Sequence, residues 1–118
     1  MTEGGKKNVM NIENEYILCA AILFKDGEHY VHSPVNIEYG LVLCGFRHGD
    51  IFCQTRMLRK QRMELGVLEE EQGFLTSKNR FVDRREAATI ALSQNQFKDP
   101  EEYFEVSKSN YLYSENIY

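Results

Sequence analysis

The chain has 118 residues, 42% of them apolar, and a formal net charge of −4. This length predicts one domain, and the acidic balance argues against bulk nucleic-acid binding, which requires a basic domain. No apolar run approaches the roughly 18 residues of a membrane-spanning helix, and the first residues lack the apolar core of a signal peptide.

Strands are predicted in the first part of the chain. Residues 1–13 are polar and contain glycine, so we expect a flexible N-terminal tail before a single domain over 14–118. The apolar run 15–24, followed by K-D-G, predicts a buried strand. Residues 28–33 alternate polar and apolar side chains and would pair back as a hairpin. Residues 39–46 predict a third, central strand.

A first helix should follow these strands. Asp50 is a candidate N-cap, and the helix would run over about residues 51–65 and end at Gly66. Residues 68–72 are acidic and predict a linker.

The second half of the chain predicts a hairpin and a second helix. Residues 73–83 form the expected hairpin, with a tight turn at 77–79. Asp83 would cap the second helix, with Glu86 completing a D-x-x-E capping box, and one helical turn is expected at Pro100. The second helix has a narrow apolar face made of Ala87, Ile90 and Ala91. We therefore predict an α+β fold, in which an antiparallel sheet of three to five strands carries two helices packed on one face.

The start of the second predicted helix carries an unusual charge. Arg84 and Arg85 stand in its first turn, where the helix dipole disfavours cations. Unpaired N–H groups and arginine forks bind phosphate, while Phe81 would stack on a base and Asn79 would contact its edge. Together with Arg80, these residues predict a nucleotide site. The alternative is that the arginines pair with nearby carboxylates and that Phe81 lies in the core.

Two further groups of basic residues are candidates. Arg47 and His48 lie between a predicted strand and a predicted helix, where α/β-type units bind ligands, so we include them in the ligand site. The alternative is a solvated loop. Arg56, Arg59 and Lys60 share one side of the first helix. They predict a second anion site, a solvated face or a subunit contact.

Metal binding and catalysis have weaker support. The three cysteines have no C-x-x-C spacing and lie in apolar runs, which indicates reduced, inert thiols and a cytoplasmic setting. His29 and His32, at i and i+3 of a predicted strand, would face opposite sides, so no metal and no cofactor are predicted. The sequence has no G-x-S-x-G, P-loop or H-E-x-x-H motif, although His48 with a carboxylate could perform acid–base chemistry.

The last ten residues contain three tyrosines. Tyrosines near a chain end often anchor interfaces, which favours a homo-oligomer, a dimer or higher. The alternative is that this segment packs along the chain's own sheet.

Three segments carry a family resemblance: G-F-R-H-G-D-I, Q-G-F-L-T-S-K-N-R-F-V-D-R-R-E-A-A-T-I-A and the terminal Y-L-Y-S-E-N-I-Y. They resemble a widespread group of small phage and prophage proteins, over residues 15–96 and the last seven. The terminal element departs from the group's pattern, with tyrosine for phenylalanine and E-N-I for E-D-L. The group is similar to the first-described Thoeris anti-defence proteins, which bind and hide the cyclic ADP-ribose-type signal made by bacterial TIR-domain proteins.

The resemblance implies a phage anti-defence protein that sequesters a cyclic nucleotide signal in the host cytoplasm without cleaving it. Relatives also trap cyclic oligonucleotides, as homo-oligomers with sites between chains. The arginines of R-F-V-D-R and Phe81 would then belong to a ligand pocket, which Arg47 could join. Two alternatives stay open: a nucleotide-processing enzyme that uses His48, and a protein-interaction module that inhibits a host factor through the basic helix and the tyrosine-rich end.

Overall fold

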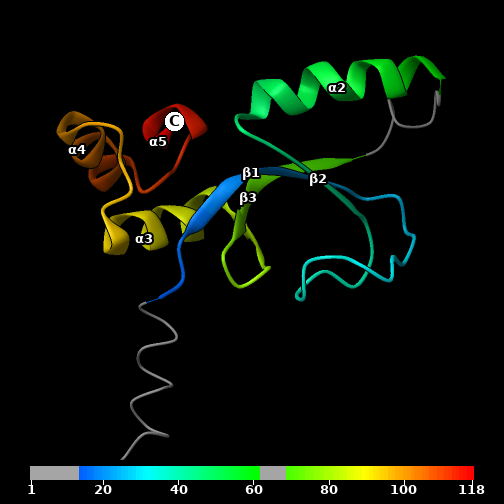
Figure 1. Ribbon diagram of the computed structural model, residues 1–118, viewed down its shortest axis with the longest axis horizontal. Coiled ribbons are helices and arrows are strands. Elements are labelled where there is room, and N and C mark those ends of the chain that lie inside the picture. The colour runs from blue at the N-terminus through cyan, green and yellow to red at the C-terminus, as the bar shows by residue number, and fades with distance from the viewer. Residues whose placement is uncertain (1–13, 62–68) are drawn as a thin grey trace, which may run out of the picture.

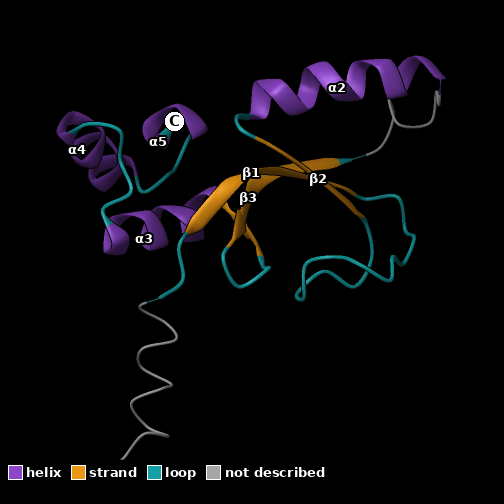
Figure 2. Cartoon of the chain, in the orientation of Figure 1, coloured by secondary structure: helices purple, strands orange, loops and turns teal. Residues whose placement is uncertain are grey.

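The computed structural model of the protein describes residues 14–61 and 69–118. These residues form an antiparallel sheet with the strand order β2-β1-β3-β4. The strands are β1 (Ile17–Phe24), β2 (Leu41–Gly45), β3 (Glu70–Thr76) and β4 (Phe81–Asp83). The helices are α2 (His48–Gln61), α3 (Arg84–Gln94), α4 (Pro100–Ser109) and α5 (Ser114–Ile117). The predicted α+β class with an antiparallel sheet is confirmed (Figure 2).

Strand β1 lies between β2 and β3 because its apolar run can be buried on both faces. Its register shifts between Ile17 and Cys19, which places Ile17 on the same face as Ala20. Ile22 and Phe24 continue this face and are almost fully buried. Removing such side chains from water contributes about 1.5 to 3 kcal/mol each.

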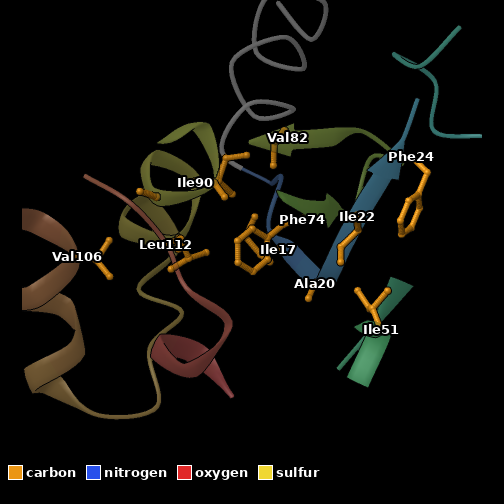
Figure 3. Close-up of a cluster of buried hydrophobic side chains, with 13 residues drawn as sticks. Ile17, Ala20, Ile22, Phe24, Ile51, Phe74, Val82, Ile90, Val106 and Leu112 are labelled. Carbon is orange, nitrogen blue, oxygen red and sulfur yellow. The ribbon is translucent and has the colours of Figure 1, made fainter. Parts of the chain in front are cut away.

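The two faces of the sheet are covered differently (Figure 1). Helices pack on one face, where Figure 3 shows a continuous core that includes Ile51 of α2, Ile90 of α3 and Val106 of α4. The opposite face, which we call the loop face, is covered by residues 25–40. Its smaller cluster contains Ala21, Leu23 and Phe81, packed against partly buried Ile37, Val42 and Leu75.

Two strand predictions are wrong. Residues 28–33 form no strand, and β1 pairs directly with β2 across the long 25–40 connection. The short alternation in 28–33 serves a surface loop instead, tied by the Gly40 N–H to the Glu28 carbonyl (2.8 Å). Gly40 has φ +118°, a left-handed conformation that turns the chain into β2. Strand β2 is also an edge strand rather than the central one.

Helix α2 begins earlier than predicted. Asp50 lies inside its first turn, where its Oδ2 accepts the Arg47 N–H (2.9 Å), so it caps the helix from within rather than as the N-cap. The predicted end at Gly66 lies outside the described residues, as does the predicted tail at 1–13. Glu70, Glu71 and Gln72 belong to β3 rather than to a linker, because their backbone pairs with β1.

The hairpin and the N-cap of α3 agree with prediction, but among the described residues no reciprocal bond of the predicted capping box is seen, because the Glu86 carboxylate pairs with Arg80. Thr76 and Arg80 close the β3–β4 turn through a main-chain hydrogen bond of 2.9 Å. The Asp83 carboxylate accepts the Glu86 N–H (2.8 Å), as an N-cap should. Helix α4 is longer than the single predicted turn and begins at Pro100 after its own N-cap, Asp99.

Candidate ligand site

The predicted ligand residues lie in three separate environments rather than in one pocket. Arg80 and Phe81 lie at β4, four basic side chains contact the C-terminal segment, and Asn79 borders a hollow on the loop face.

The Arg80 guanidinium is occupied by the chain's own carboxylates. Its Nε lies 2.8 Å from Oε2 of Glu15, and its Nη2 lies 3.0 Å from Oε1 of Glu15 and 3.0 Å from Oε2 of Glu86. The hydrogen bond from Arg80 is the main reason why the pKa of Glu15 is below its ordinary value. Arg80 is therefore not the free phosphate fork that the sequence predicted.

Phe81 is a core residue. Its side chain is 6% exposed, and its ring covers Gly73 on the neighbouring strand. A Cβ at Gly73 would lie 2.2 Å from the Val82 carbonyl oxygen and 2.8 Å from Cζ of Phe81. The prediction that Phe81 offers a stacking face to a base is therefore wrong, because the ring fills the space above Gly73.

We call the contacts between Arg47, His48, Arg84 or Arg85 and residues 111–118 the C-terminal clasp. Arg84 donates to the Leu112 carbonyl (2.8 Å) and to the Gln72 side chain, and its guanidinium carbon lies 4.5 Å from the Tyr113 ring centroid. Burial lowers the pKa of Arg84. Arg85, which is exposed, donates to the Tyr111 hydroxyl (2.8 Å) and stacks on that ring.

The other half of the clasp lies at the start of α2. His48 is buried, with Nε2 2.7 Å from the Gly73 carbonyl oxygen and Nδ1 3.3 Å from Oγ of Ser114. Desolvation is the main cause that lowers the pKa of His48. Arg47 donates to the main-chain oxygen of Tyr118, whose ring packs on Phe46.

The clasp explains how two arginines are tolerated in the first turn of α3. Arg84 donates to a carbonyl oxygen and lies over the Tyr113 ring, and Arg85 lies over the Tyr111 ring. Each tyrosine ring presents a negative π-face, which attracts the cation. Leu112 and Ser114 are buried whereas Tyr111 and Tyr113 are exposed, a two-residue alternation typical of an extended segment on a surface. The residue types do not signal this docking, because apolar Leu112 and polar Ser114 share the buried side.

A hollow of about 360 Å³ opens on the loop face, and we call it the loop-face pocket. Its lining is Val31, His32, Ser33, Pro34, Val42, Cys44, Leu75 and Asn79. The wall formed by the 25–40 loop is tied to the hairpin, because Val35 N–H donates to the Asn79 carbonyl (2.7 Å). The Asn79 amide also makes a long contact of 3.4 Å with the Ser33 carbonyl.

The lining of this pocket combines apolar and hydrogen-bonding groups. Val42 of β2 and Leu75 of β3 project from the strands on either side of β1. The polar atoms come from Asn79, Ser33 and His32. Asn79 holds φ +58° at the β3–β4 turn, a left-handed conformation that asparagine tolerates, and its side chain borders the pocket. A volume of this size is typical of small-molecule sites, and the mixed lining suits a flat ring with polar edges.

The remaining candidates add little to a site. Arg56 is exposed on α2, and the side chains of Arg59 and Lys60 lie outside the described part of the structure. Among residues 14–61 and 69–118, no group of three or more His, Cys, Asp or Glu side chains is placed to hold a metal ion. No described helix is long and apolar enough to cross a membrane.

The fold and the pocket define a small α+β protein with a ligand-sized hollow on the loop face of its sheet. The chain belongs to the Phage T4 y16D protein family, whose model matches residues 16–118, and is therefore a small phage protein. Comparison with curated proteins and with solved structures gave no match.

Proposed function

We propose that this protein binds a cyclic nucleotide signal, of the cyclic ADP-ribose type or a cyclic oligonucleotide, and holds it without cleaving it. The sequestration would take place in the cytoplasm of the infected host cell and would suppress an immune response. The ligand site is the loop-face pocket rather than the start of α3. The observation that carries the proposal is this hollow of about 360 Å³ with its mixed lining.

The pocket supplies the contacts that a nucleobase requires. Apolar side chains of Val42, Leu75 and Pro34 offer surface to the faces of the base, and the Asn79 amide can donate to and accept from its edge. His32 is exposed at the same pocket, and a ring N–H of its imidazole can donate to a phosphate oxygen.

The position of His48 supports binding over turnover. A general acid or base must reach the proton that it transfers. Both ring nitrogens of His48 instead lie within hydrogen-bond distance of Gly73 and Ser114, and the side chain is 5% exposed. The alternative of an enzyme that uses His48 therefore lacks an accessible catalytic group at this position.

The proposal includes a homo-oligomer whose second copy closes the open side of the pocket. Val31, at the pocket, is 87% exposed, and Val35 and Tyr39 of the same loop are 73% and 59% exposed. A partner placed over these side chains would exclude water and strengthen each polar contact with the ligand.

Native mass spectrometry tests the proposal directly. The full chain is incubated with cyclic ADP-ribose isomers and with cyclic di- and trinucleotides, and the mass of each complex is measured before and after denaturation. We expect a stoichiometric complex and intact ligand on release. Release of cleaved ligand, or no binding across the panel, would contradict the proposal.

Asn79→Gly sharpens the test. Glycine keeps the left-handed backbone at φ +58° but removes the amide, so we expect affinity to fall about 10- to 100-fold, the effect of one or two hydrogen bonds. Asn110→Gly is the matched control, because Asn110 also has positive φ (60°) and lies outside the pocket lining. Equal effects of the two variants would remove Asn79 from the site.

A further inference from the structure

Two cysteines lie on neighbouring strands on the loop face. Cys44 of β2 pairs with Ala21 of β1, and Cys19 lies two residues before Ala21. Because side chains alternate along a strand, Cys19 and Cys44 project from the same face as diagonal neighbours. The two thiols are near enough for each to change the pKa of the other.

The pair is accessible to small reagents. Cys44 is exposed and lines the loop-face pocket, and Cys19 is partly buried beside it. The hydrogen bond from Cys44 lowers the pKa of the Cys19 thiol and raises that of Cys44. Since the thiolate is the nucleophile, Cys19 is the sulfur that reacts first and Cys44 the one that resolves.

We propose that Cys19 and Cys44 form an oxidisable dithiol site that takes a hydroperoxide as its substrate and closes into a disulfide at the wall of the loop-face pocket. The thiolate of Cys19 attacks the terminal peroxide oxygen, so that an S–O bond forms, the O–O bond breaks, and the leaving oxygen takes a proton as alcohol or water. The sulfur of Cys44 then attacks the sulfenic sulfur. The S–S bond forms, the S–O bond breaks, and hydroxide leaves with the Cys44 proton as water.

This chemistry stands apart from the proposed function, because it needs no nucleotide. The two thiols lose two electrons and the hydroperoxide gains them, which balances the reaction. In a reducing cytoplasm such a disulfide is transient, since the thiol pool reverses it. The wall of the pocket at Cys44 therefore has two covalent states.

The third cysteine provides the control. Cys53 is exposed on α2, whereas Cys19 and Cys44 lie on the paired strands β1 and β2. In a Cys53→Ser background, the full folded chain is treated with a small excess of hydrogen peroxide, then denatured and alkylated. We expect the loss of two hydrogens per chain and a Cys19–Cys44 cross-linked peptide, which dithiothreitol should reverse.

Removal of one thiol completes the test. Cys44→Ser in the same background should give sulfenic and higher oxidation states at Cys19 and no intramolecular cross-link. Both thiols remaining alkylatable in the Cys53→Ser chain, after a peroxide dose that oxidises Cys53 in wild type, would overturn the proposal. So would cross-links that form only between chains. Circular dichroism before treatment shows that each variant is folded, so the result reports on the thiols.

Discussion

The guanidinium group of Arg80 and the carboxylate of Glu15, 65 residues apart in the sequence, join through two hydrogen bonds of 2.8 and 3.0 Å. Thr76 donates a third bond to Glu15 (2.7 Å). This contact fixes the residues before β1 against the β3–β4 hairpin. The same arginine was a candidate phosphate ligand, so the pairing converts a predicted binding group into a structural one.

Glu15→Gln should destabilise the fold at neutral pH. The pair is partly buried, so we expect a loss of about 1 to 3 kcal/mol in the free energy of unfolding. Glu69→Gln is the control, because its partner Lys25 and Glu69 itself are exposed, and it should cost less than about 0.5 kcal/mol. Urea unfolding followed by circular dichroism measures both, and equal losses would contradict the assignment.

The pH dependence of the same pair gives a second measurement. The folded chain holds the pKa of Glu15 below the ordinary 4.5, so below pH 4.5 the unfolded chain binds more protons. The stabilisation is therefore fully present above pH 4.5 and is lost as pH falls through the folded pKa. Glu15→Gln should remove this part of the acid destabilisation.

His48 should give a separate pH window. The folded pKa of His48 is below 6.5, the ordinary value that applies to the unfolded chain. Between the folded pKa and pH 6.5 the unfolded chain therefore binds more protons, and stability falls as pH drops. His48→Gln should flatten the pH dependence of the unfolding free energy below pH 6.5, and should lower the unfolding free energy at pH 7 by about 1 to 2 kcal/mol through lost hydrogen bonds. Urea unfolding at a series of pH values measures this, and a pH profile that stays unchanged in His48→Gln would contradict the assignment.

Gly73→Ala should destabilise the sheet by about 2 to 3 kcal/mol, as overpacking does. The new methyl group would meet the Val82 main chain and the Phe81 ring, and a backbone atom cannot move aside. Gly49→Ala is the control, since a Cβ there meets nothing within 4 Å. Thermal unfolding of both variants checks this, and a stable Gly73→Ala chain would show that the approach of Phe81 is looser than described.

Arg84→Lys should loosen the C-terminal clasp without unfolding the sheet. Lysine keeps the charge but loses the planar fork that reaches Leu112 and stacks on Tyr113. Amides of residues 112–118 should exchange with deuterium about 10-fold faster, which corresponds to about 1.4 kcal/mol of local stability. Arg85→Lys, at the exposed Tyr111 contact, should change this exchange much less. Unchanged exchange in Arg84→Lys would mean that other contacts hold the segment.

Local signals in the sequence were sufficient for the hairpin and for α3. The turn at 77–79 and the cap at Asp83 depend on residues within a few positions, so the local sequence was enough to predict them. Residues 28–33 show the limit of this method, because alternation describes a possible strand without providing a partner for it. Strand β1 instead paired with β2 and β3, which are far along the chain.

The candidate site depended even more on distant contacts. The sequence suggested that Arg84 and Arg85 need compensation, and the structure supplies it from Leu112, Tyr113 and Tyr111. Nothing near the arginines in sequence indicated that partner. Asn79 was predicted correctly as a polar turn residue, but its hollow is formed by the 25–40 loop, whose path could not be inferred from local pattern.

The side chain of Asn36 has a consequence for the solubility of this protein. Its amide accepts the Phe81 N–H (2.8 Å) and donates to the Phe81 carbonyl (2.7 Å), in the place that the main chain of an added strand would take on β4. Exposed strand edges recruit other chains and start aggregation. Asn36 therefore shields β4 from β-augmentation, and fibril growth from this edge would first have to displace the 25–40 loop.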